Sequence, residues 1–144
     1  MGDRAFFDTN IVIYAFAEND ARLESAEKLV NAGGVVSVQI LNEVANTLLR
    51  KFRFAWPRIH RIIDVILDTC PDPLPLRIDT HRRALRVCER YRYSFYDGLI
   101  VASALEAGCR VLYTEDLQHG QVIEGLRIEN PFLQDQPIAA ESGE

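Results

Sequence analysis

The sequence predicts a single α/β domain in which helices flank both faces of a small parallel β-sheet. Short apolar runs alternate along the chain with longer segments of helical periodicity, which is typical of βα units in a parallel sheet. Two of these runs stop at acidic residues, as buried strands do when they deliver polar side chains to the carboxyl edge of a sheet. A length of 144 residues, 48% hydrophobic and 26% charged, suits one globular domain. We expect this domain to span residues 1–133, followed by a polar, flexible tail at 134–144.

The first elements are expected to be a strand and two helices. Residues 4–7 are mostly apolar and predict the first strand. A short helix should follow, with its apolar positions at Ile11, Val12, Tyr14 and Ala15. In residues 20–32 apolar side chains recur at helical spacing, which predicts an amphipathic helix. Asp20 is its expected N-cap, and Gly33-Gly34 is its expected end.

A strand and two further helices should come next. Residues 35–38 are largely β-branched and predict a strand, and residues 39–54 have the apolar spacing of a helix. Pro57 fits the first turn of another helix. One face of that helix carries Ile59, Ile62, Ile63 and Ile66. Val65 and Leu67 add apolar surface outside this face, which points to a partner or to self-association.

The last third of the predicted domain returns to βα alternation. Residues 74–78 are expected to form a strand, and the arginine-rich residues 79–92 a helix. Residues 95–107 are apolar nearly all round, which predicts a buried helix. Residues 110–113 and 126–128 are short apolar runs that predict the last two strands.

Several classes of protein are disfavoured by the composition. No apolar stretch approaches the roughly 20 residues that span a bilayer, and the N-terminus lacks the pattern of a signal peptide. Three scattered cysteines without a CxxC pair indicate neither a disulfide framework nor a thiolate zinc site. The three histidines do not form an HExxH motif. We therefore expect a cytoplasmic protein that does not interact with a membrane.

The charge is uneven along the chain. The net charge of −5 becomes −1 when the four candidate site acids described next are set aside. Residues 77–92 hold six arginines against two acids, a local charge of +4. A second basic group consists of Arg50, Lys51, Arg53, Arg58 and Arg61. These groups predict either a solvated helix face or a rim that attracts phosphates around an acidic centre.

Four acidic residues are candidates for one site. Asp8 and Asp116 follow predicted strands, whereas Glu43 and Asp97 lie on predicted helices. Each alone could be a cap, a helix-dipole partner or an exposed acid. Together at one sheet edge they would repel each other unless a cation neutralised them, and oxygen ligands favour Mg²⁺ or Mn²⁺. Such a metal suits phosphate-ester hydrolysis, and the chain has neither a GxSxG motif nor a P-loop to indicate other chemistry.

The segments around these acids resemble a known family in combination. The segments are residues 6–11, Asn42-Glu43, residues 95–102 and residues 112–117. They resemble the four acidic motifs of PIN-domain ribonucleases, and most closely those of the VapC-type toxins of bacterial toxin–antitoxin pairs. The resemblance runs from about residue 4 to Asn130-Pro131-Phe132, nearly the whole chain.

This resemblance implies a metal-dependent endoribonuclease that hydrolyses RNA phosphodiester bonds. The implied catalytic residues are Asp8, Glu43, Asp97 and Asp116. Asp8 and Asp97 would be the principal ligands of Mg²⁺ or Mn²⁺, with Asp116 as a further metal residue. Donors that orient the carboxylates would be Thr9, Asn10 and Thr114. The implied partners are the RNA substrate, a cognate antitoxin and a second copy of the chain.

Two alternatives and several details stay open at this point. A haloacid-dehalogenase-like phosphohydrolase also begins with an aspartate after its first strand, but its phosphatases need a second aspartate where this chain has Asn10. A PIN-like module that binds RNA or protein without cleaving is the other alternative. The sequence does not specify the RNA, the antitoxin or the number of metal ions. It also leaves open whether Glu43 and Asp116 ligate directly, and whether Glu115 contributes.

Overall fold

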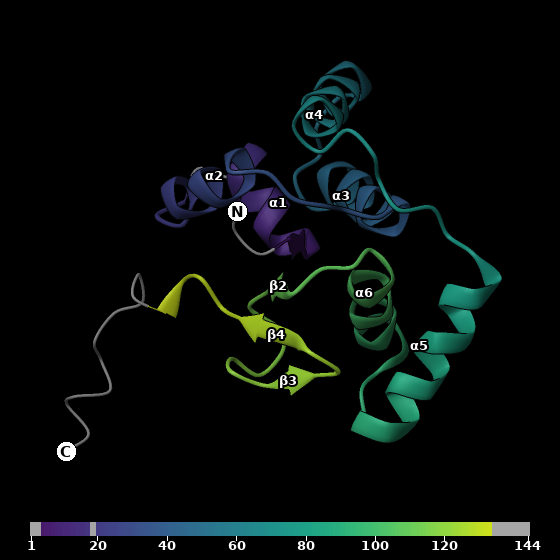
Figure 1. The fold of residues 1–144 in the computed structure, drawn as a ribbon. Helices are drawn as coiled ribbons and strands as arrows, with labels where there is room; N and C mark the ends of the chain where they lie inside the picture. Colours follow the sequence, from purple (N-terminus) through teal and green to yellow (C-terminus); the bar gives the residue numbers. More distant parts are fainter. Residues whose placement is uncertain (1–3, 18–19, 134–144) are drawn as a thin grey trace.

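The computed structural model describes residues 4–17 and 20–133, and it has the expected α/β architecture. In the described part of the chain the elements follow in the order β1-α1-α2-α3-α4-α5-α6-β2-β3-β4. Figure 1 shows helices α1 to α4 gathered on one side of the sheet and the α5–α6 pair on another. The predicted fold class is thus confirmed, while the tail predicted at 134–144 lies outside the described residues.

The sheet has the strand order β1-β2-β4-β3. Strands β1 (Ala5–Phe7), β2 (Val111–Tyr113) and β4 (Leu126–Glu129) are parallel, with Phe6 beside Leu112 and Leu112 beside Ile128. Strand β3 (Val122–Ile123) was not expected and runs antiparallel to β4. It was missed because it is only two residues long, although the Glu124-Gly125 turn, with both φ angles positive, is a hairpin signal.

The strands predicted at 35–38 and 74–78 are wrong in extent. Val35 continues the parallel pairing next to β1 through two backbone hydrogen bonds, and Leu74 forms a single bridge to Ser37. The first run cannot extend further because Ser37 is the N-cap of the next helix, its Oγ accepting a hydrogen bond from the Ile40 amide at 3.2 Å.

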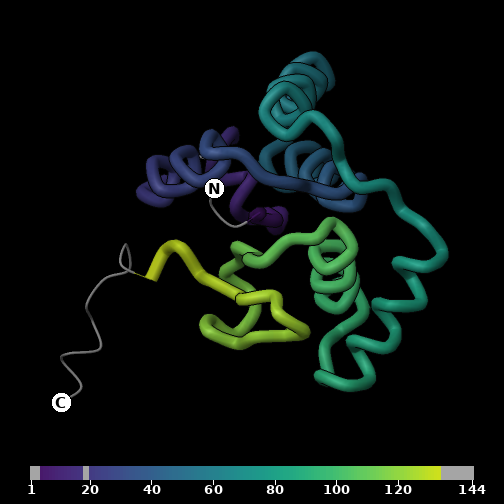
Figure 2. The backbone as a smooth tube through the Cα atoms, in the orientation of Figure 1, coloured from purple at the N-terminus to yellow at the C-terminus, as the bar shows by residue number. Residues whose placement is uncertain are grey.

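The predicted helices are all present, with shifted ends. They are α1 (Thr9–Phe16), α2 (Leu23–Asn31), α3 (Val38–Arg50), α4 (Trp56–Thr69), α5 (Ile78–Tyr91) and α6 (Phe95–Glu106). Asp20 is not the N-cap of α2: that position is Arg22, and the Asp20 carboxylate instead accepts from the Arg22 amide in the preceding turn. Figure 2 traces the connection that leads from α4 to α5 along the outside of the molecule.

The core lies between the sheet and the helices, and α6 is its most enclosed helix. Residues 98–104 are all buried, as the apolar composition predicted. Helix α5 packs so closely on α6 that a Cβ atom at Gly98 would lie 2.2 Å from the Cys88 sulfur. This close approach fixes the start of α6, where Asp97 lies.

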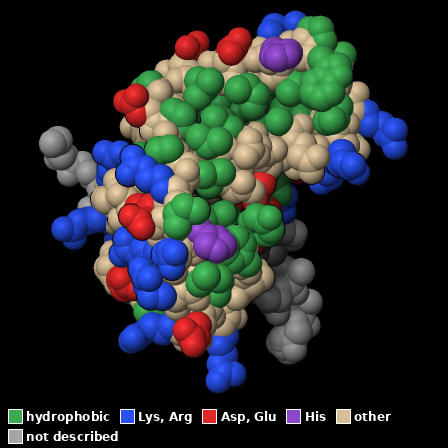
Figure 3. Space-filling model, turned by 90° about the vertical axis from the view of Figure 1, so that its right-hand side faces the viewer, with side chains coloured by type: hydrophobic (Ala, Val, Ile, Leu, Met, Phe, Trp, Pro, Cys, Tyr) green, Lys and Arg blue, Asp and Glu red, His purple; other side chains and the backbone are tan. Residues whose placement is uncertain are grey.

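Two kinds of surface share the face shown in Figure 3. Lys and Arg side chains gather over the α5 half of this face, and apolar side chains cover the α4 half. On α4, Val65 is 47% exposed, as expected, whereas Leu67 is only partly exposed. Trp56, which was not predicted to be part of this surface, is 60% exposed. None of the helices in the described residues is long and apolar enough to cross a membrane.

Candidate functional site

Asp8 lies at the carboxyl end of β1 and caps α1. Its side chain is buried, with Oδ1 accepting a hydrogen bond from the Thr9 amide and Oδ2 accepting one from Thr114 Oγ1, both at 2.6 Å. Both donors are neutral, and no cationic side chain pairs with Asp8 among the described residues. A buried carboxylate without a counter-charge is unfavourable, which marks this position as unusual.

The loop after β2 brings Thr114 and Asp116 beside Asp8, because β1 and β2 are adjacent parallel strands that end at the same edge. Thr114 is fully buried, and its hydroxyl donates to Asp8 while accepting from the Asp116 amide at 3.1 Å. Asn10 Nδ2 donates to Asp116 Oδ2 at 3.1 Å. The threonine hydroxyl therefore links the two acids that follow the strands.

Glu115 makes contacts different from those of its neighbour Asp116. Its Oε1 accepts a hydrogen bond from the Tyr14 hydroxyl at 2.8 Å, and its Oε2 is 3.9 Å from Arg22 Nε. Arg22 Nη1 also donates to the Tyr14 hydroxyl at 2.9 Å. Glu115 is thus held by α1 and the residue before α2, which supports Asp116 as the acid that faces Asn10. Tyr14 and Arg22 were not predicted, since no sequence spacing relates them to the loop after β2.

Glu43 approaches the site from α3. Its Oε1 accepts a hydrogen bond from Thr9 Oγ1 at 2.5 Å, and its Oε2 accepts one from Gln39 Nε2 at 3.2 Å. Gln39 was not predicted, although its position four residues before Glu43 on one helix face could have indicated the contact. Thr9, Asn10 and Thr114 therefore each donate a side-chain hydrogen bond to one of the four candidate acids.

Asp97 is half-buried in the first turn of α6. Within the described residues no hydrogen bond or ion pair holds its carboxylate. Its charge nevertheless contributes to raising the pKa of Asp116, Tyr93 and Cys88, so it lies within electrostatic reach of these groups. The N-terminal end of α6 favours the negative charge of Asp97.

The electrostatics of the site favour protonation. Burial raises the pKa of Asp8 from 3.8 to about 6, with the charges of Asp116 and Glu43 adding to the rise and the Thr114 and Thr9 hydrogen bonds opposing it. Burial, together with the charges of Glu115, Asp97 and Glu43, also raises the pKa of Asp116. Carboxylates arranged this way are stabilised in their ionised form by a cation.

The donor set fits a hard cation, although it is not a preformed cluster. In the described part of the chain, no three His, Cys, Asp or Glu side chains are close enough together to hold a metal ion. Mg²⁺ needs only one or two carboxylates, with water completing its shell. The Asn10 Oδ1 atom is buried without a hydrogen-bond partner, so a neutral oxygen donor is available beside the acids. Ligation by Asp8, Asp97 and Asp116 remains a prediction.

A cavity of about 280 Å³ opens beside these acids. Its lining comes from α1, the end of α3 and the loop after β2: Thr9, Asn10, Ile13, Tyr14, Thr47, Lys51, Glu115 and Asp116. Lys51 is the only lining residue of this cavity with a permanently basic side chain. The cavity thus combines carboxylates and hydroxyls with one ammonium group.

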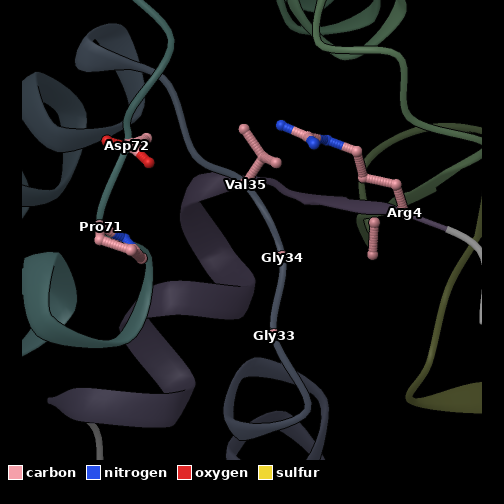
Figure 4. Close-up of a pocket in the computed structure, with 7 residues that line it drawn as sticks. Arg4, Gly33, Gly34, Val35, Pro71 and Asp72 are labelled. Carbon is pink, nitrogen blue, oxygen red and sulfur yellow. The ribbon is translucent and has the colours of Figure 1, made fainter.

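A second cavity, of about 250 Å³, lies at the opposite edge of the sheet (Figure 4). Arg4, which precedes β1, and Asp72 face it from different elements, and Gly33 and Gly34 form part of its wall. Gly34 passes so close to the Phe7 ring that a Cβ atom would lie 2.4 Å from it. None of the predicted site residues lines this cavity.

Comparison with known proteins places the chain in a family. Residues 5–124 match the PIN domain family. No curated protein sequence matches the chain. Among solved structures, a toxin–antitoxin complex from Klebsiella pneumoniae is similar at a TM-score of 0.67 and 22% identity, over 88% of this chain and 97% of that one.

Two further solved structures share the fold with a comparable degree of similarity. VapC20 of Mycobacterium tuberculosis, described as a toxin that cleaves the sarcin–ricin loop, has a TM-score of 0.59 and 20% identity over 78% of this chain and 91% of that one. A DNA-bound VapBC from Salmonella typhimurium has a TM-score of 0.62 and 18% identity over 90% and 99% of the two chains. The haloacid-dehalogenase alternative has no support in these comparisons. The match over residues 5–124 establishes that this chain belongs to the PIN-domain family.

Proposed function

We propose that the chain is a metal-dependent endoribonuclease and the toxin component of a toxin–antitoxin pair. The observation that carries the proposal is the state of Asp8, a buried carboxylate with a pKa raised to about 6 and only neutral donors around it. A group of this kind at the carboxyl edge of a parallel sheet is suited to a divalent cation. The likeness in fold to VapC20, a toxin that cleaves the sarcin–ricin loop, supports RNA as the substrate.

The four candidate acids would have different roles in binding the metal. Asp8 and Asp97 would be the principal ligands, and Asp116 and Glu43 would complete the acidic set. Bound there, Mg²⁺ or Mn²⁺ would polarise the phosphoryl oxygen and acidify a water molecule. Thr114 holds the Asp8 carboxylate through a 2.6 Å hydrogen bond, so that the carboxylate is already oriented before the reaction begins.

The proposed partners follow from the same comparisons. Structures of similar fold include toxin–antitoxin complexes, which supports an antitoxin as a partner of this chain. The exposed Trp56 and Val65 on α4 supply apolar surface of the kind that protein contacts bury. A homodimer is also part of the proposal. The thiols of Cys70, Cys88 and Cys109 are all free, which supports a reducing cytoplasm.

Cleavage of bacterial RNA tests the catalytic part of the proposal. The full chain, freed of co-purified protein, is incubated with total RNA in Mg²⁺, Mn²⁺ or EDTA, and new RNA ends are mapped. We expect cleavage only with metal, and a loss on the order of 100-fold or more in Asp97→Asn, because a bound metal contributes several kcal/mol to the transition state. Asp68→Asn, which changes an exposed acid on α4, is the matched control and should cleave as the wild type does.

Metal binding measured separately by calorimetry distinguishes the alternatives. Metal-dependent cleavage that persists in Asp97→Asn would contradict the proposed site. Metal binding without cleavage of any RNA in the pool would favour the non-catalytic PIN-like module instead.

A further inference from the structure

Lys51 lies beside the acidic residues of the candidate site. It follows directly on the end of α3, the helix that carries Glu43, and it lines the cavity that also exposes Asp116. Glu43, Thr47 and Lys51 are spaced four residues apart, so they lie along one face of the helix. The backbone distance along that face from Glu43 to Lys51 is about 12 Å at 1.5 Å per residue.

The Lys51 side chain can reach back along this face. Side chains on a helix lean toward its N-terminus, which here is the direction of Glu43 and the cavity. The cavity, about 280 Å³, is large compared with the roughly 30 Å³ that one water molecule takes up in the liquid. It can therefore hold a phosphate group together with its hydrating water.

The ammonium group of Lys51 is available for an incoming anion. In the part of the chain that the structure describes, Lys51 forms no ion pair, and its Nζ lies 5.7 Å from the centre of the Phe52 ring. The side chain is exposed, so moving it away from this weak contact requires little reorganisation. A lysine that merely neutralised Asp116 would be expected to pair with it, and Asp116 instead accepts from Asn10.

We propose that Lys51 and the adjoining cavity form a phosphate-binding subsite, which holds an RNA backbone phosphate next to the one that is cleaved. This inference rests on the proposed ribonuclease function. An RNA chain that approaches Asp8, Asp116 and Glu43 meets like charges. A cation beside the reacting phosphate offsets this repulsion and sets the register of the strand. Lys51 is then a positioning residue, with no role in the bond that breaks.

RNA binding to the full chain tests the inference without relying on cleavage. The probe is a fluorescent 20-nucleotide single-stranded RNA of mixed sequence, titrated by anisotropy at several salt concentrations, with Asp97→Asn in every protein to prevent cleavage. We expect Lys51→Met to weaken binding 3- to 10-fold and to reduce the slope of log K against log salt by about 0.7, the value for one phosphate contact on a single strand. Lys51→Arg should keep most of the affinity, because it keeps the charge.

Lys28→Met is the matched control. Lys28 is also an exposed lysine, lies on α2 and is not part of the cavity lining. Binding should be nearly unchanged in this variant. In proteins with an intact Asp97, Lys51→Met should slow cleavage of dilute total RNA by the same 3- to 10-fold, while cleavage at saturating RNA stays near the wild-type rate.

The outcomes separate this inference from the proposed function. Equal losses in the Lys51 and Lys28 variants would mean that only the overall charge matters, and would overturn the subsite. Unchanged binding in Lys51→Met, with RNA still bound and cleaved by the wild type, would also overturn the subsite and leave the ribonuclease proposal standing. A wild-type chain that neither binds nor cleaves RNA would refute the proposed function and the inference with it.

Discussion

Replacing Asp8 by asparagine should stabilise the metal-free protein at neutral pH. The raised pKa means that folding favours the protonated form of Asp8. The contribution of this group to stability is therefore greatest below pH 3.8, and it is lost as the pH rises through about 6. A rise in pKa from 3.8 to about 6 corresponds to about 3 kcal/mol, at 1.4 kcal/mol for each pH unit.

In the wild type, Thr114 Oγ1 donates a hydrogen bond to the Asp8 carboxylate at 2.6 Å. Asparagine removes the charge of this carboxylate but presents an amide group to the threonine hydroxyl. Disturbing that hydrogen bond costs about 1 kcal/mol at every pH. In EDTA we therefore expect Asp8→Asn to be about 2 kcal/mol more stable than the wild type at pH 8 and about 0.5 kcal/mol less stable at pH 4, because pH 4 is slightly above the ordinary pKa of 3.8 and ionisation of Asp8 already costs the wild type some stability there. Urea unfolding across this pH range measures both values.

The stability difference between the two proteins should change by about 2.5 kcal/mol from pH 4 to pH 8. This change is the decisive quantity, because packing effects of asparagine do not depend on pH. Mg²⁺ should stabilise the wild type and leave Asp8→Asn unchanged, since only the wild type offers the carboxylate. A difference between the two proteins that stays constant from pH 4 to pH 8 would refute the reasoning, as would an equal response to Mg²⁺. Asp68→Asn, an exposed acid on α4, should show neither effect.

Three further outcomes can be checked by similar means. Asp116→Asn should reduce the rate of RNA cleavage at least 10-fold. Glu115→Gln should keep the rate within about 3-fold of the wild type, because Glu115 is held by contacts with α1. Equal losses of the two variants in cleavage assays would contradict this assignment. Thr114→Val should lower the free energy of unfolding by about 1–3 kcal/mol, since two hydrogen bonds at a fully buried hydroxyl are lost, and Thr114→Ser should restore most of it. Gly98→Ala should destabilise by about 1–3 kcal/mol because its Cβ would overlap the Cys88 sulfur; thermal unfolding of the double variant with Cys88→Ala should recover stability, and no recovery would show that the clash lies elsewhere.

Much of the fold was predictable because it depends on local patterns. The helices follow apolar spacing. Helix α6 was expected to be buried because it carries apolar residues on nearly all of its faces. The errors occurred where pairing with distant segments decides the outcome. Residues 35–38 have strand-forming side chains, but Ser37 caps α3 and ends the run. Strand β3 is two residues long and exists only because β4 pairs with it.

The candidate site was predictable to a similar degree. Acids that follow short apolar runs were recognisable because a parallel sheet brings strand ends to one edge, and Asp8 and Asp116 indeed lie on neighbouring strand ends. Asp116 was chosen over Glu115 from the sequence, but the different contacts of these two acids required the structure, since they depend on Tyr14 and Asn10 reaching them from α1. The role inferred for Lys51 likewise depends on the cavity between α1, α3 and the loop after β2.

The sequence by itself determined the α/β class and the helices, and it predicted the four candidate acids, because these depend on the order and spacing of residue types along the chain. Only the tertiary structure decided the burial of Asp8, its raised pKa and its hydrogen bond to Thr114. The physical reason is that burial and charge–charge energies depend on distances between residues as far apart in sequence as 8 and 114. Such distances exist only once β1 and β2 have paired.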